Sequence, residues 1–521
     1  MEKKLNLILP FVFAMMVIPV CAQTTLNQRV YYSFEQLENR NGWLNSQNAA
    51  GLATYDQDDF TQAEVKSRIT KGDLHQVYDP SRSIDYQLDI RSYQRINQIM
   101  LYGRFVFDYD IKKNQNWSSM TYPGSSPLHI ADMTPGTQTK ETYFVDGGIG
   151  VPLGGNWTAG GAFDFEGVTN AKKKDIRNKN SFSRYHLSPS LTWESGQIRL
   201  GASYTYGSEV EEIEWTTYGD KNQHEVFFFQ GLWFGPSEIT SSSITGRRFE
   251  RSMNRGALQL EYFTPRIRLF NQLQLQQEEQ KAYLVIEQER GGENKKATYR
   301  YNGQLWLTQK RFDHSLKWSA SHDFLKNYQN LQQREMINHI YQYVQYGTLL
   351  RYTESNWEGR LSYELVRKRQ SDDWNRSWSF HSDLGFQSRQ QRYCAYPSVF
   401  RQDIKRMYGL AGFEKNLLMR TGMIDLGLDM HYSAGWGTPV DPQAQDLNGH
   451  HYREDLQQQE YAYLTAHVLG GKLHAKYSWF FDREEGRSVF AKAAYNYQRS
   501  TASAMKDHKR TFAEITLGLN F

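Results

Sequence analysis

The amino-acid sequence predicts an all-β fold, a transmembrane antiparallel up-and-down β-barrel of about 16–18 strands. Long extracellular loops and a short N-terminal lead-in or hatch complete the predicted architecture. Three observations support it: apolar and polar residues alternate with period two, an export signal precedes them, and an amphipathic strand ends on Phe521. A strand with one apolar and one polar face lies between two different media.

Residues 1–22 have the composition of a secretory signal peptide. Two lysines precede the apolar run 5–20, which is followed by Cys-Ala-Gln. The run is shorter than the roughly 20 residues that a membrane-spanning helix needs. We expect cleavage after Ala22 rather than lipidation of Cys21, because Val20 stands where a small residue would precede a lipidated cysteine. The mature chain then keeps only Cys394, which excludes an internal disulfide.

The composition excludes two other classes of protein. Beyond the signal no apolar stretch is long enough for a membrane helix, and the mean hydropathy is −0.72. The formal net charge of +4, from 61 basic and 57 acidic residues, gives no case for nucleic acid as a partner. The 34 tyrosines and 13 tryptophans suit a membrane interface, where amphipathic rings settle.

Residues 23–80 precede the regular strands and are expected to form a lead-in, a possible hatch and the first strand or strands. The plug domain of a TonB-dependent receptor is longer than this, so the chain is not such a receptor by itself. As a whole, the sequence resembles the large outer-membrane barrel families of Bacteroidota. That resemblance implies a location and names no substrate.

Residues 46–55, SQNAAGLATY, resemble the Asn-Pro-Ala-Gly segment at the start of FadL-like channels for hydrophobic compounds. Asn48, Ala50 and Gly51 match, and alanine stands at the usual proline. The resemblance implies that residues 28–47 form a small hatch inside the barrel. The alternative is a periplasmic lead-in outside it.

Residues 81–521 are expected to form the barrel. The stretch RYHLSPSLTW is typical: its apolar face carries Tyr185, Leu187, Leu191 and Trp193, and its other face carries charged and hydroxyl side chains. Such segments run about ten residues, the length with which a tilted strand crosses a bilayer. A soluble core would not accept these charges unpaired. A closed barrel accommodates both faces and leaves no strand edge in hydrocarbon.

The last ten residues, FAEITLGLNF, place Ile515, Leu517, Leu519 and Phe521 on one face of a strand. They resemble the C-terminal signal of bacterial outer-membrane barrels, which ends in phenylalanine after alternating apolar residues. The resemblance implies recognition by the barrel-assembly machinery.

Inward-facing charges of both signs are expected along the polar faces. The pore-lining candidates are Asp164, Glu166, Arg184, His186, Arg199, Asp425, Asp429, His431, Lys472 and Lys476. A pore selective for one ionic sign is lined mainly by the opposite sign. Mixed signs therefore predict a lumen that is cross-linked by ion pairs and is either plugged or weakly selective.

One motif hints at catalysis. HYSAG, residues 431–435, resembles the His-x-Ser-x-Gly strand of outer-membrane phospholipase A, and period two puts His431 and Ser433 on one face. A third group would have to orient the histidine, and Asp429 or Asn448 is a candidate. The pair faces inward in the predicted register, away from lipid, so we predict two pore-lining residues and no enzyme.

Two other stretches allow alternative interpretations. In the loop 446–455, adjacent histidines lie among carboxylates, but no zinc-site spacing appears, so we predict a solvated loop without metal or cofactor. VFFFQGLWFG, residues 226–235, is the most apolar stretch outside the signal. It suits a strand extended beyond the membrane, an apolar gate or a docking patch.

The leading functional hypothesis is an outer-membrane barrel that acts as a passive channel for a small or hydrophobic solute. The alternatives are an accessory barrel beside a TonB-dependent importer and a barrel lipid hydrolase. The expected partners are outer-membrane lipid, the assembly machinery and, in the second case, a TonB-dependent transporter. Solute, partner and oligomeric state are left open.

Overall fold

The computed structural model describes residues 31, 33–218, 223–240, 246–284, 290–337, 340–370, 374–441, 451–502 and 504–521. The expected signal peptide and its cleavage site lie outside the described residues. So do residues 446–450 of the histidine loop, including Asn448.

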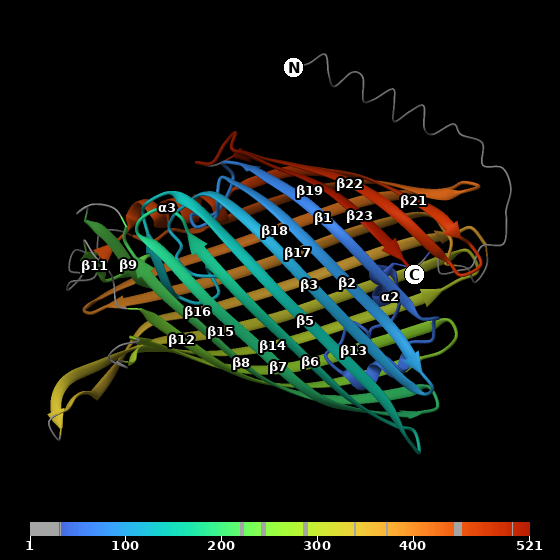
Figure 1. Ribbon diagram of the computed structural model, residues 1–521, viewed down its shortest axis with the longest axis horizontal. Coiled ribbons are helices and arrows are strands. Elements are labelled where there is room, and N and C mark those ends of the chain that lie inside the picture. Colours follow the sequence, from blue (N-terminus) through green and yellow to red (C-terminus); the bar gives the residue numbers. More distant parts are fainter. Residues whose placement is uncertain are drawn as a thin grey trace, which may run out of the picture.

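Eighteen antiparallel strands form one closed sheet, which confirms the predicted barrel and sets the strand number at the upper end of the expected range (Figure 1). The closing pair is β1 with β23, in a register from Gln62↔Asn520 to Gly72↔Arg510. The barrel strands are β1 (Phe60–Gly72), β2 (Arg82–Ile96), β3 (Ile99–Gln115), β5 (Gly136–Gly154), β6 (Trp157–Lys172), β7 (Arg177–Ser195), β8 (Ile198–Thr216), β12 (Arg247–Phe263), β13 (Ile267–Leu284), β14 (Arg290–Thr308), β15 (Phe312–Ile337), β16 (Ile340–Lys368), β17 (Arg376–Ala395), β18 (Ser398–Leu418), β19 (Gly422–Thr438), β21 (His467–Asp482), β22 (Arg487–Ala502) and β23 (Lys509–Asn520).

The remaining elements lie outside the barrel sheet. Before the first strand come α2 (Phe34–Arg40) and the short 3₁₀ helix η4 (Ala49–Thr54), and in the connections between strands lie β4 (Leu128–Asp132), β9 (His224–Gln230), β10 (Phe234–Gly235), β11 (Ser237–Thr240), β20 (His451–Tyr452) and α3 (Glu454–Leu464). Ser33 caps α2 by accepting a hydrogen bond from the Gln36 N–H at 3.3 Å. None of the described helices is long and apolar enough to cross a lipid bilayer.

The alternation in the sequence decides which face of each strand points outward. On β12 the outward Leu258 is 63% exposed, whereas the inward Glu261 is 1% exposed. A slip of one residue would exchange the two faces, which fixes the register. A bilayer requires a spanning structure to have an apolar exterior and a closed sheet without free strand edges, and this barrel has both.

The last residue is held in place by backbone hydrogen bonds. The Phe521 N–H donates to the Thr61 carbonyl at 2.9 Å, and the Phe521 carbonyl accepts from the Thr61 N–H at 2.7 Å. Aromatic side chains gather at this end of the barrel, where Trp157 and Trp193 stand opposite each other with ring centroids 6.4 Å apart. We call this end the C-terminal rim and the opposite end the long-loop rim.

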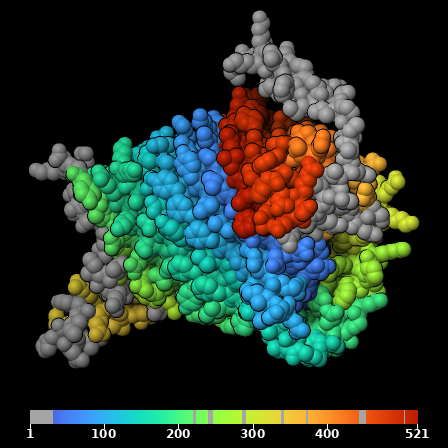
Figure 2. Space-filling view, turned by 45° about the vertical axis from the view of Figure 1, so that its right-hand side comes forward, coloured from blue at the N-terminus to red at the C-terminus, as the bar shows by residue number. Residues whose placement is uncertain are grey.

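The two rims differ in their connections. Short turns join strands at the C-terminal rim, such as residues 97–98 between β2 and β3. The connections 116–135, 217–246 and 439–466 join strands whose ends lie at the long-loop rim. The hairpin of β15 and β16 extends furthest beyond the long-loop rim. Its pairing with β14 stops at Gln329 and its pairing with β17 stops at Tyr352, whereas β15 and β16 stay paired with each other to their ends. It projects as the yellow arm of Figure 2.

Candidate functional site

The segment before β1 lies inside the barrel. We call residues 33–59 the inner segment. Its Arg40 guanidinium pairs with Asp313 of β15 at 3.0 Å, and its Phe34 ring stacks on Tyr93 of β2 with centroids 5.3 Å apart. Since these strands belong to separate parts of the wall, the inner segment bridges the lumen near the C-terminal rim (Figure 1).

The stretch 48–51 of the inner segment is bound to the wall through its backbone and one amide. The Asn48 amide nitrogen lies 3.1 Å from the Leu191 carbonyl and 3.0 Å from Gln259 Oε1, and the Ala50 N–H donates to Ser190 Oγ at 3.0 Å. These contacts come from β7 and β12. The residues that carry the sequence resemblance therefore lie at a contact with the barrel wall.

Glycines in the wall make room for this contact. A Cβ at Gly160 of β6 would lie 2.0 Å from the Ala50 nitrogen. A Cβ at Gly201 of β8 would lie 2.7 Å from both the Asn48 amide and the Trp43 ring. Both distances are shorter than any real Cβ contact, so only glycine lets the inner segment approach this closely.

A single buried carboxylate anchors the other side of the stretch. Glu261 accepts hydrogen bonds from the Trp43 indole at 2.6 Å and from Arg199 at 2.8 Å, and Arg268 lies 3.3 Å away. The side chain is 1% exposed. One carboxylate thus pairs with two arginines and fixes the inner segment through Trp43.

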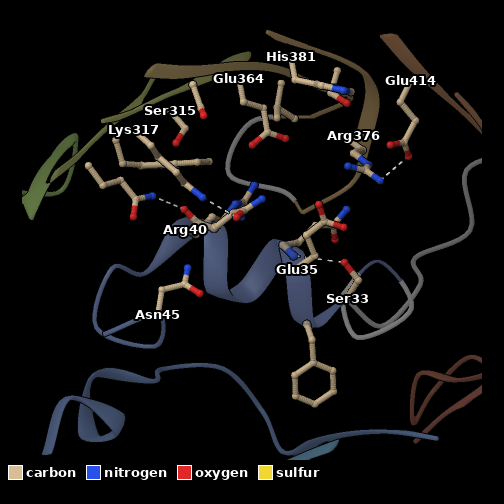
Figure 3. Close-up of a pocket in the computed structure, with 18 of the residues that line it drawn as sticks. Ser33, Glu35, Arg40, Asn45, Ser315, Lys317, Glu364, Arg376, His381 and Glu414 are labelled. Carbon is tan, nitrogen blue, oxygen red and sulfur yellow. Dashed lines mark hydrogen bonds and ion pairs between the residues drawn. The ribbon is translucent and has the colours of Figure 1, made fainter. Parts of the chain in front are cut away.

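A chamber of about 950 Å³ lies between α2 and the wall, and its lining comes from β1, β2 and strands between β13 and β22. Figure 3 shows Glu35 and Arg40 of α2 below it and Lys317, Glu364 and Arg376 of the wall around it. Polar and charged side chains dominate this lining.

The arginines of the chamber are paired with carboxylates. Arg360 lies 3.1 Å from Asp383, and Arg376 forms an ion pair with Glu414. His381 on β17 reaches Asp429 on β19 at 3.1 Å by passing over β18 at Gly412, where a Cβ would lie 2.2 Å from the imidazole. The pairs hold neighbouring strands together and leave few arginine charges open to a solute.

The structure brings four of the expected pore-lining residues into this chamber, namely Asp425, Asp429, Lys472 and Lys476. Four of the other six pair with each other: Arg184 with Glu166 at 2.7 Å and His186 with Asp164 at 2.9 Å. Arg199 pairs instead with Glu261, which was not among the candidates. These groups cross-link the inner wall.

The HYSAG strand carries no assembled triad in the described residues. The Ser433 hydroxyl accepts a hydrogen bond from Arg406 at 3.1 Å, and Asp429 is engaged by His381. His431 Nε2 is buried without a hydrogen-bond partner among the described residues. The residues that could orient the histidine are therefore engaged elsewhere or, for Asn448, lie outside the described residues.

At the long-loop rim, three connections fold together into a cap, which we define as residues 116–135, 223–240 and 451–466. β9 pairs with β4 of one connection and with β11 of its own, and β10 pairs with β20 of the third. The apolar stretch 226–235 forms the centre of the cap: Phe227 and Phe229 pack with Trp117 and Leu456. The stretch thus joins the connections to one another.

The same stretch anchors the cap to the wall. The buried Phe234 ring stacks on Tyr393 of β17 with centroids 4.6 Å apart and on Tyr452 of the cap at 4.3 Å. Arg453 places its guanidinium 4.3 Å from the Trp117 ring centroid. A connection that leaves the barrel between β8 and β12 therefore reaches the wall of β17.

One titratable group is buried in the cap. The His129 Nε2 lies 2.7 Å from the Trp117 carbonyl, and Nδ1 is buried without a hydrogen-bond partner among the described residues. Burial among aromatic rings lowers the pKa of His129 to about 4. The imidazole is therefore neutral at pH 7, with the proton on Nε2.

Acid is expected to loosen the cap. The pKa of His129 is about 6.5 when exposed and about 4 when buried, so stability of the closed cap is lost as the pH falls between these values, by about 3 kcal/mol in total. Tryptophan fluorescence of the cap, recorded from pH 7 to pH 4, measures the loosening. A His129→Gln variant, which cannot titrate, should show a flat response; equal curves for both proteins would contradict the assignment.

Sequence reasoning did not single out Glu261, Trp43 or the cap. Period two does place Glu261 on the inward face of its strand, between the outward Leu260 and Tyr262, so the direction of its side chain could be predicted. The partners of Glu261 could not be predicted, because they come from three separate parts of the chain.

Comparisons with known proteins gave one family and several solved structures. Residues 49–521 match the model of a "Family of unknown function (DUF6850)". No curated protein matches the sequence. Similar solved structures include the siderophore receptor PiuA from Acinetobacter baumannii (9% identity, TM-score 0.43, 89% of this chain and 82% of that one) and the outer membrane transporter YddB from Escherichia coli (8%, 0.39, 89% and 81%). The ferric citrate transporter FecA is similar at 8% identity and a TM-score of 0.40, over 89% of this chain and 79% of its own.

Proposed function

The chain belongs to the family of unknown function DUF6850, whose model spans residues 49–521, and we propose that it is an outer-membrane transport protein for a small polar solute. One observation carries the proposal: a polar chamber of about 950 Å³ inside the barrel, bounded by α2 of the inner segment and the strand wall. A barrel that served only as an anchor would gain nothing from such a space, whereas a transporter needs one.

The proposed location rests on the exterior and on the last strand. Ile515 and Leu517 are 63% and 59% exposed on the outer surface, and Phe521 is 46% exposed. Leu519, on the same strand, is half-buried. These residues suit contact with lipid and, by their resemblance to the C-terminal signal, recognition by the assembly machinery. An export signal over residues 1–22 would deliver the chain there.

The chamber lining bears on the class of solute. FadL-like channels, which residues 46–55 resemble, carry hydrophobic compounds, and an apolar solute would need an apolar binding surface. The chamber instead presents side chains such as Lys317, Glu364 and Arg376. A polar solute can replace water at these groups and a hydrophobic one cannot.

The conductance of the purified mature protein in a planar bilayer tests the proposal. We expect a low resting conductance, because the inner segment occupies the lumen and the cap lies at the long-loop rim. Stepwise openings should become more frequent as the pH is lowered to 4 and the cap loosens. A bilayer that stays silent from pH 7 to pH 4, with protein shown to be inserted, would remove the transport role.

A second candidate is an accessory barrel that works beside a TonB-dependent importer. The hairpin of β15 and β16 favours it, because beyond Gln329 and Tyr352 the described residues of these strands pair only with each other and stand above the rim (Figure 2). Such an arm presents a surface to a neighbouring protein. Co-purification of a large transporter, lost when the arm is shortened to a tight turn, would support this role over the first.

A further inference from the structure

Three lysines on neighbouring strands line the chamber and form no ion pair with a carboxylate of the described residues. Lys476 of β21 and Lys492 of β22 stand directly opposite each other, and Lys472 lies four residues from Lys476 on the same face of β21. No carboxylate oxygen of the described residues lies within 4.0 Å of any of the three ammonium groups, although Arg360 and Arg376 in the same chamber are both paired.

The nearest carboxylates are engaged by other groups. Asp425 and Asp429 of β19 are the cross-strand neighbours of Lys476 and Lys472. Asp425 accepts a hydrogen bond from the Asn416 amide at 2.6 Å, and Asp429 is paired with His381 at 3.1 Å. Both carboxylates thus bond to side chains of β18 and β17, on the other side of β19 from the lysines.

Placing these lysines side by side costs free energy. Like charges directly opposite each other on an antiparallel pair repel. Lys476 is stabilised in part by the Phe490 ring, whose centroid lies 4.2 Å from its ammonium group, but Lys492 has no such contact among the described residues. The lysines therefore form a basic face that an incoming anion would neutralise.

Resting on the proposed transport role, we propose that this basic face, Lys472, Lys476 and Lys492, binds the oxyanion of the solute, a carboxylate or phosphate group. Ammonium groups bind such oxyanions as point charges through short charge-assisted hydrogen bonds. The solute class is therefore a small polar molecule that carries a carboxylate or phosphate.

Thermal unfolding of the full chain in detergent, followed by the heat-dependent gel shift of the barrel, tests binding directly. Inorganic phosphate and acetate are the probes, each compared with chloride at equal ionic strength. We expect phosphate, acetate or both to raise the midpoint by about 2–4 °C beyond chloride. A Lys472→Gln, Lys476→Gln, Lys492→Gln variant should start from a higher midpoint, because the repulsion is gone, and should not respond to either probe.

The control variant removes the same charge from exposed lysines: Lys173→Gln, Lys174→Gln, Lys506→Gln. It should respond like the wild type. An equal rise with chloride, or an equal response of the triple basic-face variant, would overturn the proposal. If the triple variant does not assemble, the single variant Lys492→Gln is tested instead. A smaller rise of its unfolding midpoint than in the wild type supports the proposal, and an equal rise overturns it. Because the readout is binding, a protein that binds phosphate but passes no current retains this inference and loses the transport role.

Discussion

Replacing Gly160 by leucine is expected to expel the inner segment from the barrel. A Cβ at this position would lie 2.0 Å from the Ala50 nitrogen and 2.4 Å from the Ala49 carbonyl carbon. Those atoms are backbone and cannot rotate aside, and the segment is also tied there by Asn48. Overpacking against flexible side chains costs about 1–3 kcal/mol, and a clash with backbone costs more. The wall strand is fixed by two neighbours, so the inner segment moves.

The same strand offers a matched control. Gly161 points outward, and a Cβ there would have its nearest neighbour 4.0 Å away, on Ile149. Gly161→Leu should therefore leave both the fold and the conductance unchanged. Gly160→Leu should raise the single-channel conductance several-fold and expose residues 33–59 to protease from the C-terminal rim. A variant with unaltered conductance and protease resistance would show that the inner segment does not restrict the lumen.

The barrel could be predicted from the sequence because each strand separates lipid from a wet interior. Side chains that face lipid are therefore apolar and those that face the interior are polar, as in Leu258 and Leu260 against Glu261. The ends of the strands were harder to predict. The strands continue beyond the expected ten residues, to 29 in β16. Outside the bilayer both faces of a strand meet water or protein, so the alternation loses its physical cause.

The cap and the inner segment could not be predicted in the same way. The stretch 226–235 is mostly apolar because other parts of the chain cover most of it. An apolar run alone does not tell whether lipid, a partner or the same chain covers it. Gly160 and Gly201 look like ordinary strand glycines until the inner segment lies against them. Contacts between segments more than a hundred residues apart leave no local period.

The expected ion pairs illustrate the same limit. Period two placed Arg184, Glu166 and Lys472 inward, and the structure brings the first two together at 2.7 Å. It leaves Lys472 without a carboxylate within 4.0 Å in the described residues, because Asp429 reaches His381 over Gly412 instead. The direction in which a side chain points follows from the sequence. Which ion-pair partner it finds depends on the size of the neighbouring side chains.

Glu261→Ala is expected to be the most destabilising single substitution in the wall. The change leaves Arg199, Arg268 and the Trp43 indole around a buried site without their acceptor. Breaking a buried pair costs about 3–5 kcal/mol, because the remaining charge is uncompensated. Arg199 also bonds Glu194, whose side chain is 44% exposed, so Glu194→Ala should cost no more than about 1 kcal/mol. The two substituted carboxylates both pair with Arg199 and differ in how deeply they are buried.

Urea unfolding of both variants in detergent, followed by tryptophan fluorescence, measures the difference. Trp43→Phe separates the two consequences of losing Glu261: it removes the indole hydrogen bond and leaves both arginines paired. We expect it to loosen the inner segment at a cost of about 1–3 kcal/mol, with barrel unfolding little changed. Equal destabilisation by Glu261→Ala and Glu194→Ala would mean that water already reaches Glu261. The inner segment would then be held mainly by its glycine-lined contact and by Arg40 and Phe34, and Gly160→Leu would become the decisive variant.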